Sequence, residues 1–84
     1  MELTGIIELD VHGMRAEEAV DAIQKKINLA KNNIYRIRII HGYHGGVRIK
    51  TAIREEFGYG REPKILRIAP GQNDGITELI LREY

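Results

Sequence analysis

The 84-residue chain contains neither cysteine nor serine. The absence of cysteine excludes disulfides and thiolate metal sites, and the absence of both residues excludes the usual nucleophiles of hydrolytic triads. No apolar run approaches the roughly 18 residues needed to span a bilayer, and no basic, apolar leader opens the chain. We therefore expect a cytoplasmic protein that does not interact with membranes and whose chemistry rests on histidine, carboxylate and backbone groups.

The length and composition indicate one globular domain. Eighty-four residues leave no room for a second hydrophobic core, and the hydrophobic (43%) and charged (30%) fractions are ordinary for a soluble domain. No linker, internal repeat or low-complexity segment interrupts the chain. We predict a single domain over residues 1–84, with its structured core between about residues 6 and 82.

The net charge is only +1, but the charges are unevenly distributed. No acidic residue occurs between Asp21 and Glu55. The basic residues of this interval are Lys25, Lys26, Lys31, Arg36, Arg38, Arg48, Lys50 and Arg54. A basic middle in a nearly neutral chain favours one positive face that would attract a polyanion, although solvated positions on helices and strands would produce the same pattern.

Hydrophobic periodicity predicts six elements in the order βαβαββ. Apolar residues alternate with polar ones in the predicted strands and recur every three or four residues in the predicted helices. The strands are expected over residues 6–11, 34–40, 64–69 and 76–82, and the helices over residues 16–30 and 47–57. In the third strand Leu66 and Ile68 are expected to face the core, and the turn between the last two strands would pair them antiparallel.

This order predicts an α/β fold, a two-layer sandwich. Strand–helix–strand units with short loops imply right-handed crossovers and parallel pairing of the first two strands, which gives a four-stranded mixed sheet. Two helices can cover only one face of such a sheet. The other face would carry the polar positions of the strands, namely Glu8, Asp10, Arg36, Arg38, Arg67, Glu78 and Arg82.

Two strand ends, at residues 10–13 and 41–46, carry all three histidines. If the two strands are parallel, both turns lie at the same edge of the sheet. Asp10 and His12 are two residues apart and share a face, where the carboxylate can fix the imidazole tautomer or join it in binding a divalent metal. Alternatively, Asp10 pairs with an arginine of the neighbouring strand, and His12 only ends the strand.

Residues 41–46 form a glycine-rich loop directly before a predicted helix. Glycines let backbone amides converge, and the start of a helix attracts an anion. Arg48 and Lys50 lie in the first helical turn, where cations oppose the helix dipole, and Arg15 stands where a helix N-cap residue is expected. These placements favour a phosphate or carboxylate nearby, with Tyr43 able to stack on a base. A flexible connection that needs positive φ is the alternative interpretation.

These motifs resemble those of the Smr (small MutS-related) domains. The stretch Leu9-Asp10-Val11-His12-Gly13, followed by Glu17-Glu18-Ala19, is similar to their Leu-Asp-x-His-Gly opening, and residues 41–46 are similar to their His-Gly-x-Gly-x-Gly motif. The segment Asn73-Asp74-Gly75-Ile76-Thr77 resembles the turn and last strand that close the domain. The sequence has His44 where the second motif has a glycine, and Val47-Arg48 where Leu-Arg is common.

The resemblance implies a βαβαββ fold like that of the C-terminal domain of translation initiation factor three. It also implies a nucleic-acid role, because several Smr domains nick DNA or cleave RNA. A larger repair- or translation-related partner protein is implied too, since Smr domains also occur within MutS2-type proteins. The motif residues carried over by position are Asp10, His12, His41, Gly42 and Gly46, with Arg15 at a position where the family often has Arg or Thr.

We therefore predict a nucleic-acid-binding domain with endonuclease activity on DNA or RNA. Asp10, His12 and His41 are the candidate catalytic residues, with a histidine as general base and Asp10 orienting it or holding a divalent metal. The candidate nucleic-acid-binding residues are Arg15, Arg38, Gly42, Tyr43, Gly45, Gly46, Arg48 and Lys50. The alternatives are a DNA- or RNA-binding module without catalysis and, third, a protein-interaction domain that uses the open sheet face.

Overall fold

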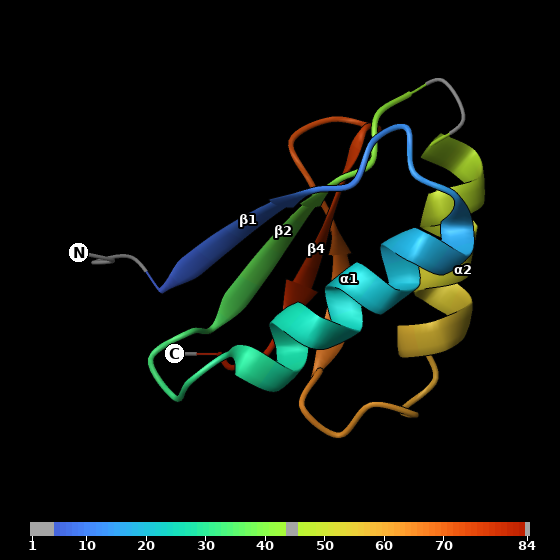
Figure 1. Cartoon of the computed structure of the whole chain (residues 1–84). Helices are drawn as coiled ribbons and strands as arrows, with labels where there is room; N and C mark the ends of the chain where they lie inside the picture. Colours follow the sequence, from blue (N-terminus) through green and yellow to red (C-terminus); the bar gives the residue numbers. More distant parts are fainter. Residues whose placement is uncertain (1–4, 44–45, 84) are drawn as a thin grey trace.

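The computed structural model describes residues 5–43 and 46–83, which form four strands and two helices (Figure 1). The strands are β1 (Ile6–Asp10), β2 (Arg36–Ile40), β3 (Arg67–Pro70) and β4 (Ile76–Ile80), and the helices are α1 (Ala16–Leu29) and α2 (Gly46–Phe57). The predicted order βαβαββ is confirmed, and apart from the start of β3 every boundary lies within two residues of its prediction. Among the described residues, no helix has the length and apolar character that crossing a membrane requires.

The four strands form one mixed sheet in the order β1-β2-β4-β3. β1 and β2 are parallel, whereas β4 is antiparallel to both of its neighbours, β2 and β3. The two helices contact each other and cover one face of the sheet, which leaves the other face open (Figure 1). The predicted two-layer sandwich is confirmed, and β2 and β4 are its central strands.

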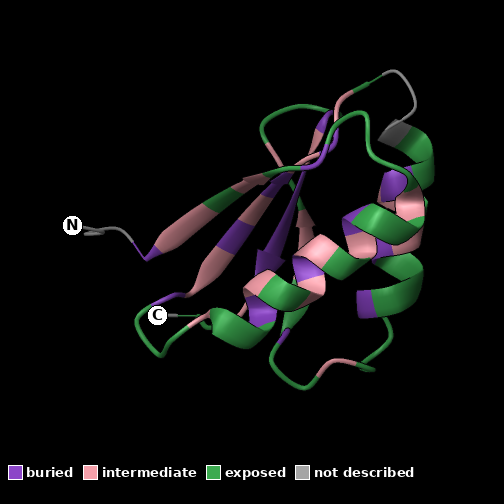
Figure 2. Ribbon diagram, viewed as in Figure 1, coloured by how far each residue is buried: buried purple, intermediate pink, exposed green. Residues whose placement is uncertain are grey.

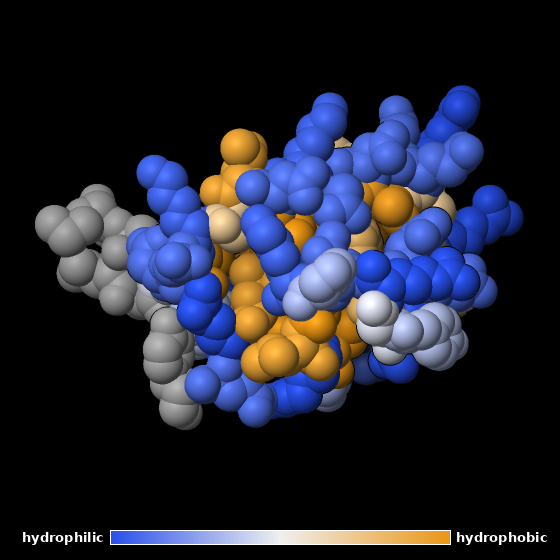
Figure 3. Space-filling view, turned by 90° about the horizontal axis from the view of Figure 1, so that it is seen from below, coloured by the Kyte–Doolittle hydropathy of each residue, from blue (hydrophilic) through white to orange (hydrophobic). Residues whose placement is uncertain are grey.

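The core lies between the sheet and the helices and is built largely from isoleucine. Residues spaced by three or four in the helices meet alternate residues of the strands, because these spacings bring side chains to one face. The members without exposed surface include Ile23, Ile27, Ile37, Ile39, Ile53 and Leu79. Buried stripes on both helices face the sheet (Figure 2), and at the lower end of the molecule hydrophobic side chains reach the surface within a hydrophilic surround (Figure 3). Each fully buried isoleucine stabilises the fold by about 1.5–3 kcal/mol.

The third strand begins later than predicted. It starts at Arg67 instead of Lys64, and Leu66, which was expected to face the core, is 61% exposed, whereas Ile65 is buried. The cause is a turn at Glu62, whose carboxylate accepts the Lys64 N–H at 3.0 Å and whose carbonyl accepts the Ile65 N–H at 3.1 Å. Because this turn precedes the strand, Ile65 enters the core and Leu66 points to solvent.

The strand register arranges the open face in three rows, since residues directly opposite each other in a sheet point to the same side. The first row contains Ile6, Arg36, Ile80 and Arg67; the middle row contains Glu8, Arg38, Glu78 and Ala69; the last row contains Asp10, Ile40 and Ile76. The last row is the one nearest to the ends of β1 and β2. The expected polar face is therefore polar in its middle and mixed at its two ends.

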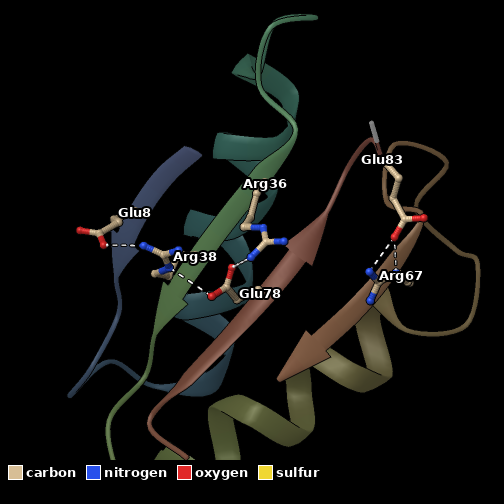
Figure 4. A network of polar contacts seen from close by, with 6 residues as sticks. All are labelled: Glu8, Arg36, Arg38, Arg67, Glu78 and Glu83. Atoms are coloured by element: carbon tan, nitrogen blue, oxygen red, sulfur yellow. Dashed lines mark hydrogen bonds and ion pairs between the residues drawn. The ribbon is translucent and has the colours of Figure 1, made fainter. Parts of the chain in front are cut away.

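Ion pairs connect the arginines of the open face to buried and exposed glutamates (Figure 4). Glu78, which is only 3% exposed, accepts a hydrogen bond from Arg36 Nη1 at 2.8 Å and another from Arg38 Nε at 3.2 Å. Arg38 also donates from Nη1 to Glu8 at 3.2 Å. Glu78, and after it Glu8, raises the pKa of Arg38. Two glutamates thus neutralise two arginines within the sheet.

We expect the substitution Glu78→Gln to lower the free energy of unfolding by about 2 kcal/mol. Breaking a fully buried ion pair costs about 3–5 kcal/mol, but water compensates part of the loss here. The reason is that the side chains of Arg36 and Arg38 remain 34% and 22% exposed. Urea denaturation measures the change. The matched control is Glu83→Gln, in the exposed pair with Arg67, for which we expect a loss below about 1 kcal/mol. Equal losses in the two variants would contradict a structural role for Glu78.

Candidate functional site

Three loops meet at the end of the sheet where β1 and β2 finish (Figure 1). The first loop joins β1 to α1, the second joins β2 to α2, and the third is the turn between β3 and β4. We call this end of the molecule the loop end. The backbone N–H of Val11 donates to the Ile40 carbonyl at 2.9 Å, which extends the β1–β2 pairing into the first loop. The N–H groups of His41 and Gly42 both donate to the carbonyl of Gly75, at 2.9 and 3.0 Å. The predicted convergence of the two histidine-containing turns is confirmed, and the β3–β4 turn joins them.

Asp10 and His12 contact each other at this end of the open face. Asp10 Oδ1 lies 2.5 Å from His12 Nδ1 and also accepts the His12 backbone N–H at 3.1 Å. Because a carboxylate oxygen only accepts, Nδ1 carries the proton, and Nε2 of the neutral ring keeps a free lone pair. The Asp10 and His12 side chains are 53% and 70% exposed, so the pair is open to a ligand. The alternative in which Asp10 pairs with an arginine of β2 is not the observed arrangement.

The same contact changes the acidity of Asp10. The hydrogen bond from the His12 ring, followed by the bond from its backbone N–H, lowers the pKa of Asp10 below its ordinary value of 3.8. Both bonds favour the ionised carboxylate, because a protonated oxygen accepts more weakly. The carboxylate that orients His12 therefore stays charged at any pH near neutrality.

Gly42 brings the glycine-rich loop directly against His12. Its φ of +81° lies in the left-handed region, which glycine adopts without steric cost. A Cβ atom at this position would lie 3.4 Å from Cβ of His12, and a Cβ atom on Gly75 would lie 3.4 Å from Cα of Gly42. The backbones of the three loops are thus in close contact, with His12 beside them.

His41 differs from His12 because it is buried, with 1% of its surface exposed. Its Nε2 lies 2.8 Å from Oγ1 of Thr77, and its Nδ1 lies 3.1 Å from the carbonyl oxygen of Gly42. Since a carbonyl only accepts, Nδ1 donates to Gly42, and Nε2 accepts the proton of the Thr77 hydroxyl. In this arrangement His41 connects the glycine-rich loop to β4, and its ring does not reach the solvent.

Sequence reasoning missed the role of Thr77, although a signal was present. Ile37 and Ile39 face the core, and the period of two places His41 on the same side of the chain. Thr77 stands directly opposite Ile39 in the register of β2 and β4 and is 1% exposed. A polar residue at a core-facing position of one strand, next to a histidine at the end of its neighbour, indicates a buried hydrogen bond.

The cations predicted to bind nucleic acid lie in different surroundings. Arg15 is exposed at the N-cap of α1, and its backbone N–H donates to the Glu18 carboxylate at 3.0 Å, which supplies one half of a capping box. Arg48 is exposed and Lys50 is half-buried in the first turn of α2. Arg38 lies instead in the middle row, between two carboxylates. Arg15, Arg48 and Lys50 therefore belong to the loop end, and Arg38 to the ion-pair network.

The remaining predicted residues surround the glycine-rich loop. Tyr43 is 61% exposed, and Gly46 is the first residue of α2. Gly45, together with His44, lies outside the described residues. Within residues 5–43 and 46–83, no group of three or more histidine, aspartate or glutamate side chains is placed to hold a metal ion. The pair of Asp10 and His12 would give a metal ion one oxygen ligand and one nitrogen ligand.

Comparison with known proteins places the chain in a family. The family model of the Smr domain matches residues 9–80. The chain belongs to the Smr domain family. Its fold is similar to the crystal structure of the Smr domain of Thermus thermophilus MutS2, with a TM-score of 0.78 and 24% sequence identity over 92% of this chain and 99% of that one. Comparison with the curated proteins finds no match.

The matched residues of this Smr domain contain the whole loop end. Asp10, His12, the glycine-rich loop and Thr77 all lie between residues 9 and 80. The fold similarity to the MutS2 domain also covers both central strands, because it extends over nearly the full chain. The residues of the three loops therefore lie within the part of the chain that the family model matches.

We expect the carboxyl of Asp10 to titrate below pH 3.8, and the substitution His12→Ala to raise that midpoint toward 3.8. The ring hydrogen bond is the largest cause of the lowered pKa, and the backbone N–H remains in the variant. Because folding lowers this pKa, the contact stabilises the fold above pH 3.8 and is lost as the pH falls through the lowered value. Carbon-detected NMR of the Asp10 side chain measures both midpoints, and identical midpoints would contradict the contact.

We expect Thr77→Val to lower the free energy of unfolding by about 1–3 kcal/mol, because it leaves Nε2 of the buried His41 without a partner. Urea denaturation measures the loss. The control is Thr51→Val on the exposed side of α2, which should change stability by less than about 0.5 kcal/mol. An unchanged free energy of unfolding in Thr77→Val would show that the hydrogen bond between His41 and Thr77 does not contribute to stability.

Proposed function

We propose that this Smr domain binds nucleic acid where its three loops meet and cleaves a phosphodiester bond there, with His12 as general base. The observation that carries the proposal is the contact between Asp10 and His12. It holds the proton on Nδ1 and leaves Nε2 of an exposed imidazole free to accept one. A carboxylate behind a histidine serves the same purpose in hydrolytic triads, where it fixes the tautomer and stabilises the imidazolium.

The charge distribution supports binding at the loop end and not on the helices. A cavity of about 360 Å³ between α1 and α2 is lined by four carboxylates, those of Glu17, Asp21, Glu55 and Glu56. These charges repel a phosphate backbone. Arg15, Arg48 and Lys50 follow the first and second loops, where their charges attract it, and the exposed ring of Tyr43 offers a surface on which a base can stack.

In the proposed reaction, Nε2 of His12 takes a proton from a water molecule or a ribose 2′-hydroxyl. The oxygen of that water molecule or hydroxyl attacks the phosphorus at the same time. The new P–O bond forms while the P–O bond to the leaving nucleotide breaks, and the leaving oxygen receives a proton from solvent or from the imidazolium. Asp10 stabilises the positive charge on His12 during this step. Arg15 and Arg48 would bind the phosphate oxygens on which negative charge develops.

A second candidate function is nucleic-acid binding without cleavage. The burial of His41 favours a binding module, because His12 is the one exposed histidine among the described residues. His41 therefore does not supply a separate general acid. A binding module would still need the cations of the loop end. A binding module would not need the Asp10–His12 contact. Variants of these two residues therefore distinguish binding alone from binding with cleavage.

The test is a cleavage assay on supercoiled plasmid and on a structured RNA, each with and without chelator. We expect His12→Ala to lower the cleavage rate by about 10²–10⁴-fold, the contribution of a general base, while the Kd for nucleic acid changes by less than about twofold. Asp10→Asn keeps the shape of the side chain and should lower the rate as well, because it removes the charge that stabilises the imidazolium.

Binding is tested separately by Arg15→Ala, which should weaken the Kd and reduce its dependence on salt. Its control is Arg61→Ala, since Arg61 is also an exposed arginine and pairs with Glu56 at the end of α2 that lies away from the loops. A wild-type domain that binds but does not cleave would leave the binding module as the function. Parallel losses of binding and cleavage in His12→Ala would refute a catalytic role for His12.

A further inference from the structure

A cavity of about 540 Å³ lies on the open face at the end opposite to the three loops. It is lined by Tyr35, Arg36, Arg67, Ile80, Arg82 and Glu83. Arg36, Ile80 and Arg67 are neighbours in the first row of the sheet, on β2, β4 and β3, so the cavity floor is fixed by strand pairing. Because Arg36 is paired with Glu78, the charge of this cavity comes from Arg67, Arg82 and Glu83, and it is positive.

We propose that this cavity is a second phosphate site, which holds the backbone of the same nucleic-acid strand whose scissile phosphate lies at His12. This inference rests on the proposed function and specifies its substrate as a strand long enough to reach both sites. The ligand is a phosphodiester group, and the groups that recognise it are the guanidinium groups of Arg67 and Arg82.

Arg67 already binds an anionic oxygen from this chain. Its Nε and Nη2 donate to one carboxylate oxygen of Glu83, at 2.7 and 2.6 Å (Figure 4). Both side chains are about half exposed (54% and 55%), and an exposed pair of this kind contributes little to stability. A phosphodiester presents two oxygens that share one negative charge, in the geometry that a guanidinium group prefers, so it can replace Glu83 at low cost.

Arg82 has no ion-pair partner among residues 5–43 and 46–83. Its Nη2 donates to Oδ1 of Asn32 at 2.7 Å, and this partner is neutral. Arg36, by contrast, is paired with the buried carboxylate of Glu78. A phosphate in the cavity would therefore be attracted mainly by Arg82 and by an Arg67 released from Glu83.

The length of β2 sets the distance between the two phosphate sites. Arg36 and His41 are five residues apart along an extended chain, which corresponds to roughly 17 Å. A stacked strand with the duplex rise of 3.4 Å per nucleotide covers this distance with about five nucleotides, and an extended single strand covers it with fewer. Between the sites, Arg36 and Arg38 balance the charges of Glu8 and Glu78, so the strand would be held at its two ends and not along its whole length.

The experiment compares the binding of single-stranded oligonucleotides of 3 and 12 nucleotides, as DNA and as RNA, by fluorescence anisotropy. We expect the double variant Arg67→Ala/Arg82→Ala to weaken binding of the 12-mer by roughly tenfold or more. The slope of log K against log salt should become shallower by the amount that corresponds to the loss of about two phosphate contacts. Binding of the 3-mer, which cannot reach both sites, should change by less than about twofold. The matched control is Arg61→Ala, which should alter neither.

A variant that should tighten binding tests whether a phosphate replaces the carboxylate of Glu83 on Arg67. Glu83→Gln frees Arg67 and should tighten binding of the 12-mer by about two- to fivefold, whereas Glu56→Gln, which frees Arg61, should have no effect. Urea denaturation of each variant confirms the fold, which we expect to persist because Arg67, Arg82 and Glu83 are exposed.

The outcomes separate this inference from the proposed function. If the wild type binds and cleaves but the double variant binds the 12-mer like Arg61→Ala, the second phosphate site is refuted and the function stands. If the double variant loses the 3-mer as strongly as the 12-mer, the cavity binds a short anion by itself, and the single-strand connection to His12 is wrong. If the wild type binds neither length at low salt, the proposed function and this inference fail together.

Discussion

The pairing of β2 with β1 on one side and with β4 on the other is the interaction on which the rest of the structure depends. Parallel pairing brings the ends of β1 and β2 to one edge, and antiparallel pairing brings the β3–β4 turn to the same edge. The carbonyl of Gly75 extends the second pairing by accepting the N–H groups of His41 and Gly42. The position of His12 beside the glycine-rich loop follows from these backbone hydrogen bonds and from the left-handed φ of Gly42.

The charged residues of the open face serve two different purposes. Glu78 is buried and binds two arginines of β2, so these cations are used to stabilise the sheet. Other cations lie at the two ends of the face, with Arg15, Arg48 and Lys50 near the loops and Arg67 and Arg82 in the cavity. The sequence pattern of a basic middle segment does not distinguish the two groups, because it does not show that β4 pairs with β2, which places Glu78 beside Arg36 and Arg38.

Local periodicity was sufficient to predict the element order, the two-layer sandwich and the shared face of Asp10 and His12. These features depend on the spacing of residues within single elements. It failed where a contact between distant segments decides the outcome: Leu66 is exposed because of the turn at Glu62, Arg38 is neutralised by Glu78, and His41 is buried against Thr77. The strand order with β4 in the centre, on which the last two contacts depend, is a property of the whole chain.

The most direct test of the account is NMR mapping of an oligonucleotide with an uncleavable phosphorothioate backbone onto the amide resonances of the domain. If the open face and its loop end bind nucleic acid, the largest shifts fall on residues 10–15, on residues 41–43 and on the residues around Arg67 and Arg82. The groove between α1 and α2, with Glu17, Asp21 and Glu55, should remain unchanged. Largest shifts in that groove, or none at low salt, would contradict the assignment of the binding face.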